Sequence, residues 1–159
     1  MTSLLYQTDS YLRAFEATVV QVEPGERLVI LDRTAFYPGG GGQPHDLGLL
    51  RAGERTWPVV AVAKRGSDVA HQLGGDEALP GAGEAVRGEV DWVRRYRLMR
   101  THTAMHVLCG TIWREFGAQV TGGQMYLDRA RMDFELEDLS PERVRLIEER
   151  GARGEGEKE

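Results

Sequence analysis

The 159-residue chain has 41% apolar and 28% charged residues, the composition of a soluble globular protein with one ordinary domain or two small ones. Its net charge of −5 excludes nucleic-acid binding by general electrostatic attraction, so any such contact must come from a local basic patch. The sequence shows no signal-peptide pattern, and no segment approaches the roughly 18 apolar residues of a membrane span. The single cysteine, Cys109, rules out an internal disulfide, and we expect a cytoplasmic protein with no membrane partner.

The first half of the sequence predicts β-strands. Short β-branched and apolar runs alternate with Gly and Pro, which mark turns at each join. Several short strands at this spacing favour a small antiparallel β-barrel or sandwich. The expected strands are residues 17–23, 27–32, 48–53, 56–65 and 85–92.

The pattern changes to helical periodicity near Asp91. From there to Gly117 the chain has no proline and no glycine before Gly110. Residues at steps of three and four form one stripe, which indicates one face of a helix. Asp91 can cap the first turn, and Gly117 can end the last. The stripe consists of Leu98, His102, Met105, Cys109, Ile112 and Phe116.

Two more strands and a second helix are expected after this helix. Residues 119–127 and 129–138 have strand character, and apolar residues alternate with polar ones in the second. Ser140 as N-cap and Pro141 at the first helical position predict a helix over residues 140–150.

Two histidines, His102 and His106, lie four residues apart on the long helix. Residues i and i+4 share one helix face, so one divalent ion could take a nitrogen from each imidazole. Zinc suits such ligands but usually takes more than two of them. The H-E-x-x-H pattern of zinc peptidases is absent from the sequence. The alternative is that His102 is a core histidine and His106 its hydrogen-bonded neighbour, while Cys109 is a small buried hydrophobe.

Four consecutive glycines, Gly39–Gly42, are the most unusual local feature. They carry a large conformational-entropy cost, so a structural or functional reason is expected. The run fits neither a Walker A loop nor a dinucleotide-binding fingerprint. It is either a mobile turn or a loop whose backbone N–H groups approach a ligand, and the aromatic Phe36 and Tyr37 beside it favour the second interpretation.

Arginines are concentrated at the start of the long helix. Arginine suits phosphate, so this cluster is the plausible local contact for a nucleic-acid backbone in an acidic protein. The alternative is a solvated helix face, although cations at a helix N-terminus oppose the macrodipole. The cluster consists of Arg94, Arg95, Arg97 and Arg100.

Three stretches, in this order, resemble the AlaX family of free-standing alanyl-tRNA editing proteins, which are related to the editing domain of alanyl-tRNA synthetase. They are Thr34–Gly48, Arg97–Gly110 and Val120–Phe134. The resemblance covers roughly residues 17–148, and the VTGGQ form of Val120–Gln124 is more similar to the free-standing proteins than to the synthetase.

The resemblance implies an α+β fold. A small antiparallel β-barrel domain with the glycine-rich loop would span residues 1–91. The first part of an editing domain, made of a long helix, antiparallel strands and a helix, would span residues 92–150. The polar segment 151–159 has nothing to bury, and we expect it to be disordered.

The resemblance also implies a function. Family members hydrolyse the ester that wrongly joins serine or glycine to the alanine tRNA, so the expected substrates are Ser-tRNA(Ala) and Gly-tRNA(Ala) and the expected partner is the tRNA(Ala) acceptor end. His102 and His106 would be ligands of Zn²⁺. Thr121 and Gln124 would line the catalytic pocket and read the serine hydroxyl. The residues expected to bind substrate are Gly39, Gly40, Gly41, Gly42, Gln43, Arg97 and Arg100.

The sequence departs from the family pattern after His106. The family's later C-x-x-x-H zinc motif does not occur, and no histidine or cysteine follows Cys109. We therefore expect a truncated or frame-shifted product, with a deliberate fragment or a divergent member that uses a partner's ligands as alternatives. Because two ligands hold zinc weakly, we expect little or no deacylation by the chain alone. The alternative function is a non-catalytic tRNA- or partner-binding module, and a non-functional remnant is a third possibility.

Overall fold

The computed structural model describes residues 1–137 and 139–154, so the expected disorder of residues 155–159 lies outside the described part. The chain divides into two compact units. The first comprises Met1–Gly40 and Pro44–Tyr96, and the second comprises Gly41–Gln43 and the described residues from Arg97 onward. The division falls a few residues after the expected boundary at 91/92, and it assigns part of the glycine run to the second unit.

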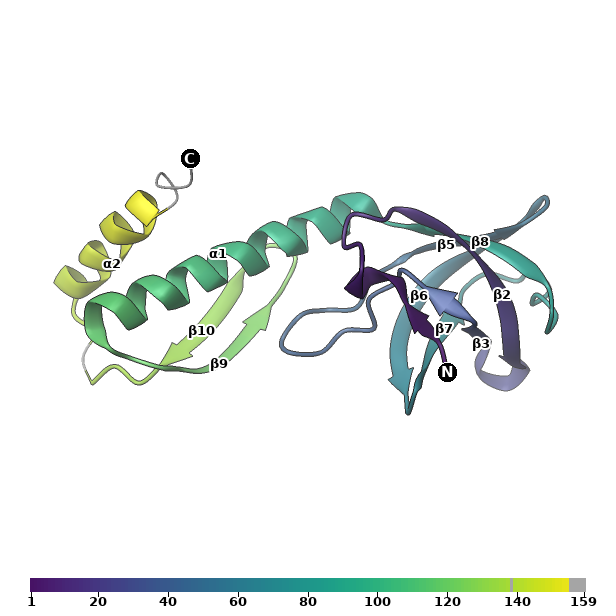
Figure 1. Cartoon of the computed structure of the whole chain (residues 1–159), viewed down its shortest axis with the longest axis horizontal. Helices are drawn as coiled ribbons and strands as arrows, with labels where there is room; N and C mark the ends of the chain where they lie inside the picture. The colour runs from purple at the N-terminus through teal and green to yellow at the C-terminus, as the bar shows by residue number, and fades with distance from the viewer. Residues whose placement is uncertain (138, 155–159) are drawn as a thin grey trace. The chain divides into compact units, whose positions relative to one another are not determined.

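Six strands of the described first unit close into an antiparallel barrel in the order β2-β3-β7-β6-β5-β8 (Figure 1). The pairing of Ala14–Thr18 with Ala85–Glu89 closes the ring. This confirms the predicted antiparallel barrel and the α+β class. The strands are β2 (Ala14–Glu23), β3 (Leu28–Leu31), β5 (Gly48–Ala52), β6 (Arg55–Arg65), β7 (Asp68–Leu73) and β8 (Ala85–Val90).

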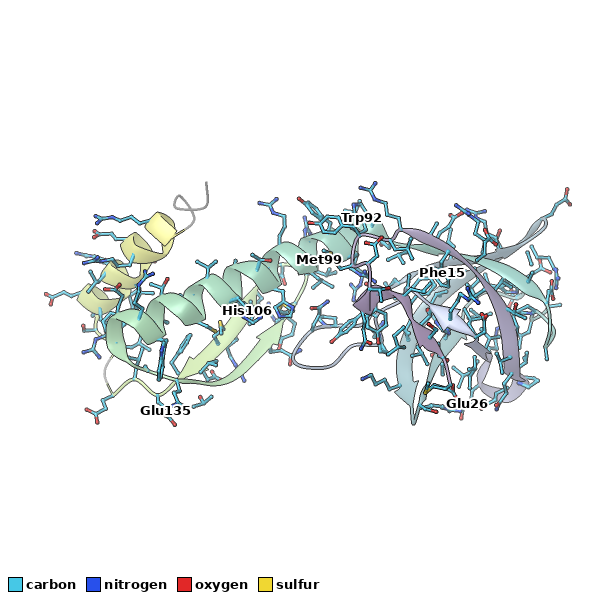
Figure 2. The ribbon with its side chains drawn as sticks, in the orientation of Figure 1. Phe15, Glu26, Trp92, Met99, His106 and Glu135 are labelled. Atoms are coloured by element: carbon cyan, nitrogen blue, oxygen red, sulfur yellow. The ribbon has the colours of Figure 1, made fainter. Side chains whose placement is uncertain are left out.

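Alternating apolar side chains fill the barrel. Along β2 the residues Phe15, Ala17 and Val19 are buried, while the residues between them are exposed, as expected of a strand with one face toward a core. Figure 2 shows Phe15 among the barrel strands. The largest fully buried side chains of the barrel are Trp57, Phe36, Leu31, Leu50 and Leu73.

Short elements complete the first unit. The 3-10 turn η2 (Pro24–Glu26) joins β2 to β3, and Arg27 ends it in the left-handed conformation at φ 53°. The strands β1 (Ser3–Leu4) and β4 (Arg33–Thr34) pair in parallel, with the turn η1 (Leu5–Gln7) after β1.

His71 is the buried histidine of the barrel. It lies in β7 and is fully buried. Its Nδ1 lies 3.3 Å from the Val29 carbonyl oxygen, and its Nε2 lies 2.8 Å from the Thr34 hydroxyl, which in turn accepts the N–H of Phe36. Burial lowers the pKa of His71 to about 4, so the ring is neutral at pH 7.

The helix α1 (Trp92–Phe116) has the predicted ends. The Arg94 N–H donates to the Asp91 carboxylate at 3.1 Å, which is an N-cap bond. Gly117 adopts φ 63°, and its N–H donates to the Trp113 carbonyl. Both predicted caps are confirmed.

Arg95 anchors the start of α1 to the barrel. Its side chain is 3% exposed, and Asp46, with which it forms an ion pair, is 1% exposed. The guanidinium also donates to the carbonyl oxygens of Ser10 and Ala35. Arg94 donates to the His45 carbonyl at 3.0 Å. Arg95 was expected to belong to a phosphate-binding cluster. This expectation is wrong, because its guanidinium is buried and bonded to Asp46, Ser10 and Ala35.

The described second unit packs a hairpin and a helix on the rest of α1 (Figure 1). The strands β9 (Val120–Met125) and β10 (Ala130–Phe134) are antiparallel, and α2 (Pro141–Gly154) follows. The Arg143 N–H donates to Ser140 Oγ at 3.3 Å, so the predicted cap is confirmed. A small core of Ile112, Ala118 and Ile147 is buried between them.

The helix α2 runs to Gly154, so four residues of the segment expected to be disordered, Gly151–Gly154, are helical. Arginine in this last turn complements the helix dipole. In the described residues, neither helix is long and apolar enough to cross a membrane.

Candidate functional site

The glycine run spans the boundary between the two units in the sequence and has four successive positive φ angles. Gly39, Gly40, Gly41 and Gly42 have φ values of 79°, 121°, 60° and 81°. Side chains other than hydrogen are disfavoured in this region of φ, so the structure supplies the expected reason for the run. The Tyr37 hydroxyl donates to the Gly40 carbonyl at 2.9 Å, which ties an aromatic residue to the loop.

Gly42 contacts the strand β9 directly. Its carbonyl accepts the Met125 N–H at 2.7 Å. A Cβ on Gly42 would lie 2.5 Å from the backbone oxygen of Gly123. The loop and the strand therefore approach as closely as two backbones can, and only glycine fits there.

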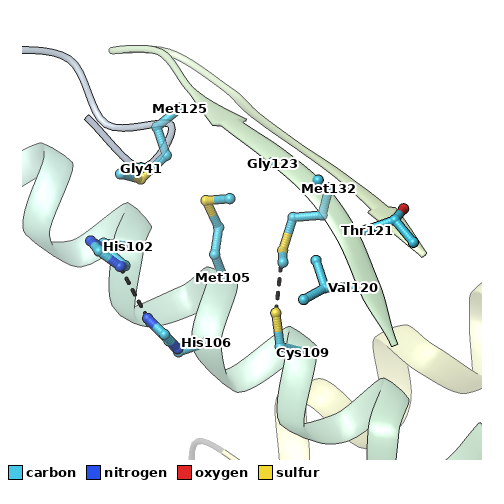
Figure 3. Close-up of a pocket in the computed structure, with 11 residues that line it drawn as sticks. Gly41, His102, Met105, His106, Cys109, Val120, Thr121, Gly123, Met125 and Met132 are labelled. Carbon is cyan, nitrogen blue, oxygen red and sulfur yellow. Dashed lines mark hydrogen bonds between the residues drawn. The ribbon is translucent and has the colours of Figure 1, made fainter. Parts of the chain in front are cut away.

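The imidazoles of His102 and His106 face each other across one turn of α1. Their Nε2 atoms are 3.0 Å apart, and the rings are stacked with an interplanar angle of 12° (Figure 3). Both side chains are exposed. The alternative of a core histidine at position 102 is therefore wrong, and the structure bears out the expected shared helix face.

Gln43 fixes the orientation of His102. Its Oε1 lies 2.8 Å from His102 Nδ1, and because an amide oxygen can only accept, Nδ1 carries the proton. This leaves the Nε2 lone pair of His102 pointing at His106. Partial burial and then the nearby His106 lower the pKa of His102, so the neutral form is favoured.

A cavity of about 390 Å³ opens beside the histidine pair. Three methionines line it, and the Cys109 thiol lies 3.9 Å from Met132 Sδ (Figure 3). Burial raises the pKa of Cys109, so it is a neutral thiol at pH 7. The lining residues are Gly41, His102, Met105, His106, Cys109, Val120, Thr121, Gly122, Gly123, Met125 and Met132.

Of the two residues expected in the pocket, the structure places only Thr121 in the described lining of the cavity. Thr121 lines the cavity, but in Figure 3 its hydroxyl points away from the imidazoles. Gln124 is not among the described lining residues, although its Cα lies beside Gly42. Arg97 and Arg100 are exposed on α1, outside the described lining, and Gly39 and Gly40 belong to the first unit.

Sequence reasoning missed the sulfur-rich wall of the cavity. Met105 and Cys109 were assigned to a helix stripe, and Met132 to an alternating strand, with no indication that they share a site. Their convergence depends on β9 and β10 packing on α1, with Gly123 paired to Met132. The nearest available signal was the Gly122–Gly123 pair, since a Cβ on Gly123 would lie 3.3 Å from Met105.

The donor set fits half of a zinc site. The Nε2 atoms of the two imidazoles lie 3.0 Å apart, and His102 has its other nitrogen bonded to an amide oxygen, the pattern that orients metal-bound histidines. Within residues 1–137 and 139–154, no third His, Cys, Asp or Glu side chain joins them in a metal-binding group.

Comparison with known proteins identifies the family of the chain. Residues 7–94 match the family of tRNA synthetases class II (A), which is more than half of the sequence, so the chain belongs to this family. The matched region contains the barrel, the glycine-rich loop and the first turn of α1.

The chain is similar to alanyl-tRNA editing proteins. It is 50% identical to the alanyl-tRNA editing protein AlaX-M of Methanosarcina acetivorans over 143 residues, which cover 86% of this chain and 58% of the relative. The AlaX-M of Saccharolobus solfataricus is 44% identical over 142 residues, 87% of this chain and 58% of the relative. These matches confirm the predicted resemblance.

Alanine–tRNA ligases are also similar. The enzyme of Ignicoccus hospitalis is 41% identical over 151 residues, which are 93% of this chain and 16% of the ligase. The chain thus spans 58% of the length of its AlaX-M relatives and a much smaller share of the ligase.

Proposed function

We propose that the chain acts in the editing of mischarged alanine tRNA by hydrolysing the ester of Ser-tRNA(Ala) or Gly-tRNA(Ala). The proposal rests on two contacts, Gln43 with His102 and His102 with His106, and on the cavity that the two histidines line. Similarity to proteins named for alanyl-tRNA editing supports the substrate class.

The residues of the cavity have distinct roles in this proposal. Gln43 holds the His102 ring so that Nε2 stays unprotonated and faces His106. The methionines and Gly123 form an apolar wall that would hold the aminoacyl group and limit access of bulk water. Thr121 is the hydroxyl-bearing residue of the wall that could distinguish serine from alanine after a change of rotamer.

His102 and His106 would hold Zn²⁺ through their Nε2 atoms. When bound, the ion would polarise water or the substrate's amino acid. Since zinc usually takes about four ligands, the pair would need further donors beyond the two imidazoles. Arg97 and Arg100, exposed on α1, would contact the phosphates of the tRNA(Ala) acceptor end.

Single-turnover deacylation tests the proposal. The purified chain, supplied with Zn²⁺, is mixed with Ser-tRNA(Ala), Gly-tRNA(Ala) or Ala-tRNA(Ala). Because two imidazoles hold zinc weakly, we expect slow hydrolysis at most; hydrolysis of the serine or glycine ester above the buffer rate, with the alanine ester left intact, supports the proposal. His102→Ala and His106→Ala should abolish the activity, and Thr103→Ala, on the same helix, should not.

Zinc content separates the editing enzyme from a non-catalytic tRNA-binding module. About one equivalent of zinc, lost in His106→Ala, is expected for the enzyme. A protein that binds tRNA(Ala) with no zinc and no deacylation, in wild type and variants alike, would instead be the binding module.

A further inference from the structure

Three aromatic rings form a row on the surface of the first unit. Tyr11 lies 5.7 Å from Trp92, and Trp92 lies 5.8 Å from Tyr96, measured between ring centroids. Trp92 and Tyr96 are stacked at 26°, as positions i and i+4 of a helix allow. The guanidinium of Arg13 lies 4.5 Å over the Trp92 ring. We call Tyr11, Arg13, Trp92 and Tyr96 the aromatic row.

The outer members of the aromatic row are open to solvent. Tyr11 is 61% exposed and Tyr96 is 43% exposed, whereas Trp92 is half-buried at the first turn of α1 (Figure 2). Rings left in water contribute little to the stability of the fold, so a run of them is a sign of a binding surface.

The carboxylates nearest in sequence are engaged locally. Asp9 accepts the backbone N–H of Tyr11 at 2.9 Å, and Asp91 caps α1 through the Arg94 N–H. Arg13 is exposed and adds a positive charge to the row. The surface therefore combines open π faces with a cation, the combination with which proteins hold unpaired nucleotides.

We propose that the aromatic row is a stacking surface for unpaired nucleotides of RNA. Bases stack on Tyr11 and Tyr96, and Trp92 with Arg13 holds these two rings in place from the centre. The choice of RNA as ligand rests on the proposed function, in which the chain acts on a tRNA. The inference deepens that function by assigning nucleotide binding to residues of the barrel unit and the first turns of α1.

Binding of a labelled oligonucleotide tests the stacking surface. The full chain is titrated into a fluorescein-labelled adenosine decaribonucleotide, and anisotropy is measured. The double variant Tyr11→Leu/Tyr96→Leu keeps apolar bulk but removes both π faces, while Tyr11→Phe/Tyr96→Phe keeps them. We expect the Phe pair to bind within about twofold of wild type and the Leu pair to bind at least roughly tenfold more weakly.

Two controls isolate stacking. An abasic decamer keeps the phosphates and removes the bases, so wild type and the Leu pair should bind it equally. Trp113→Leu removes an exposed aromatic ring of the second unit, 56% exposed, and should leave binding of the adenosine decamer unchanged. Coincident thermal melts show that the variants are folded.

The proposal is overturned if the wild type does not bind the adenosine decamer, or if the Leu pair binds it as the wild type does. Equal losses in the Leu and Phe pairs, or an equal loss on the abasic decamer, would also overturn it. The decamer carries no ester, so a failure of deacylation with this binding pattern intact refutes the proposed editing function alone.

Discussion

The side chains of Gln43 and His102 meet through a 2.8 Å contact between Oε1 and Nδ1, although they lie 59 residues apart in the sequence. This contact determines which nitrogen of His102 is free. It links the glycine-rich loop to the histidine pair within one compact unit.

Removing the Gln43 amide should weaken zinc binding. Gln43→Ala frees His102 Nδ1, and loss of such an orienting partner lowers metal affinity by about 10- to 100-fold. Gln43→Glu keeps an acceptor and should retain the affinity. Competition with a chromophoric chelator measures it, and Gln72→Ala in the barrel is the control.

A second readout of Gln43 is independent of metal. Nitrogen-15 NMR of the metal-free protein should show His102 protonated at Nδ1 in the wild type and a mixture of tautomers in Gln43→Ala. An unchanged tautomer would show that Gln43 does not orient the ring.

Gly42→Ala should open the contact between the loop and β9. Both Gly41 and Gly42 have positive φ, so alanine at either position costs about 1–2 kcal/mol. At Gly42 the new Cβ would also meet the Gly123 backbone oxygen, whereas nothing lies within 4 Å at Gly41. Amide hydrogen exchange at Met125 should therefore accelerate strongly in Gly42→Ala and little in Gly41→Ala. Equal exchange rates at Met125 in the two variants would mean that the close contact between Gly42 and Gly123 does not stabilise this part of the fold.

Breaking the buried Arg95–Asp46 pair should destabilise the first unit. Arg95→Met leaves a buried carboxylate without its partner and should lower the free energy of unfolding by about 3–5 kcal/mol. The double variant Arg95→Met/Asp46→Leu should recover much of this loss. Urea unfolding measures both, and the exposed Arg97→Met should change stability by less than about 0.5 kcal/mol. A double variant no more stable than Arg95→Met would contradict the prediction.

Acid should destabilise the barrel through His71. Its folded pKa of about 4 lies below the ordinary value of 6.5, so the unfolded chain takes up the proton first as the pH falls. The free energy of unfolding therefore decreases from about pH 6.5 toward pH 4, with about 2 kcal/mol lost by pH 5. Urea unfolding at pH 7 and pH 5 should show this loss in the wild type and a smaller loss in His71→Asn. The same pH dependence in both proteins would assign the loss to other groups.

Arg97 and Arg100 should contribute to tRNA affinity through charge. If each contacts one phosphate, Arg97→Gln and Arg100→Gln should each reduce the slope of log Kd against log salt by about one. Arg114→Gln, an exposed arginine further along α1, should leave the slope unchanged. If all three variants and the wild type have the same slope of log Kd against log salt, Arg97 and Arg100 do not contact tRNA phosphates.

Local patterns predicted the elements well. The caps at Asp91, Gly117 and Ser140 depend on residues within one turn, and each was found as expected. The shared face of His102 and His106 follows from helix geometry alone. The β-barrel was predicted because strand patterning and turn residues are also local.

The features that the sequence did not predict depend on contacts between residues far apart in the chain. In the sequence nothing distinguishes Arg95 from its neighbours Arg94 and Arg97. It is buried because it pairs with Asp46, which lies 49 residues away. His71 gave no sign of its bonds to Thr34 and Val29, which belong to other strands. The link from Gln43 to His102 has the same origin, because the tertiary fold brings these residues together.

The contact of Gly42 with Met125 has a consequence for biosynthesis. A ribosome releases the strands of the barrel before it releases β9, so β2 can pair with β8 while Gly41–Gln43 still awaits the strand that receives it. At that stage the Gly42 carbonyl lacks its Met125 partner, and we expect Gly41–Gln43 to be cleaved by proteases more readily than in the folded chain. This expected sensitivity should end once Met125 has emerged and can bond to Gly42.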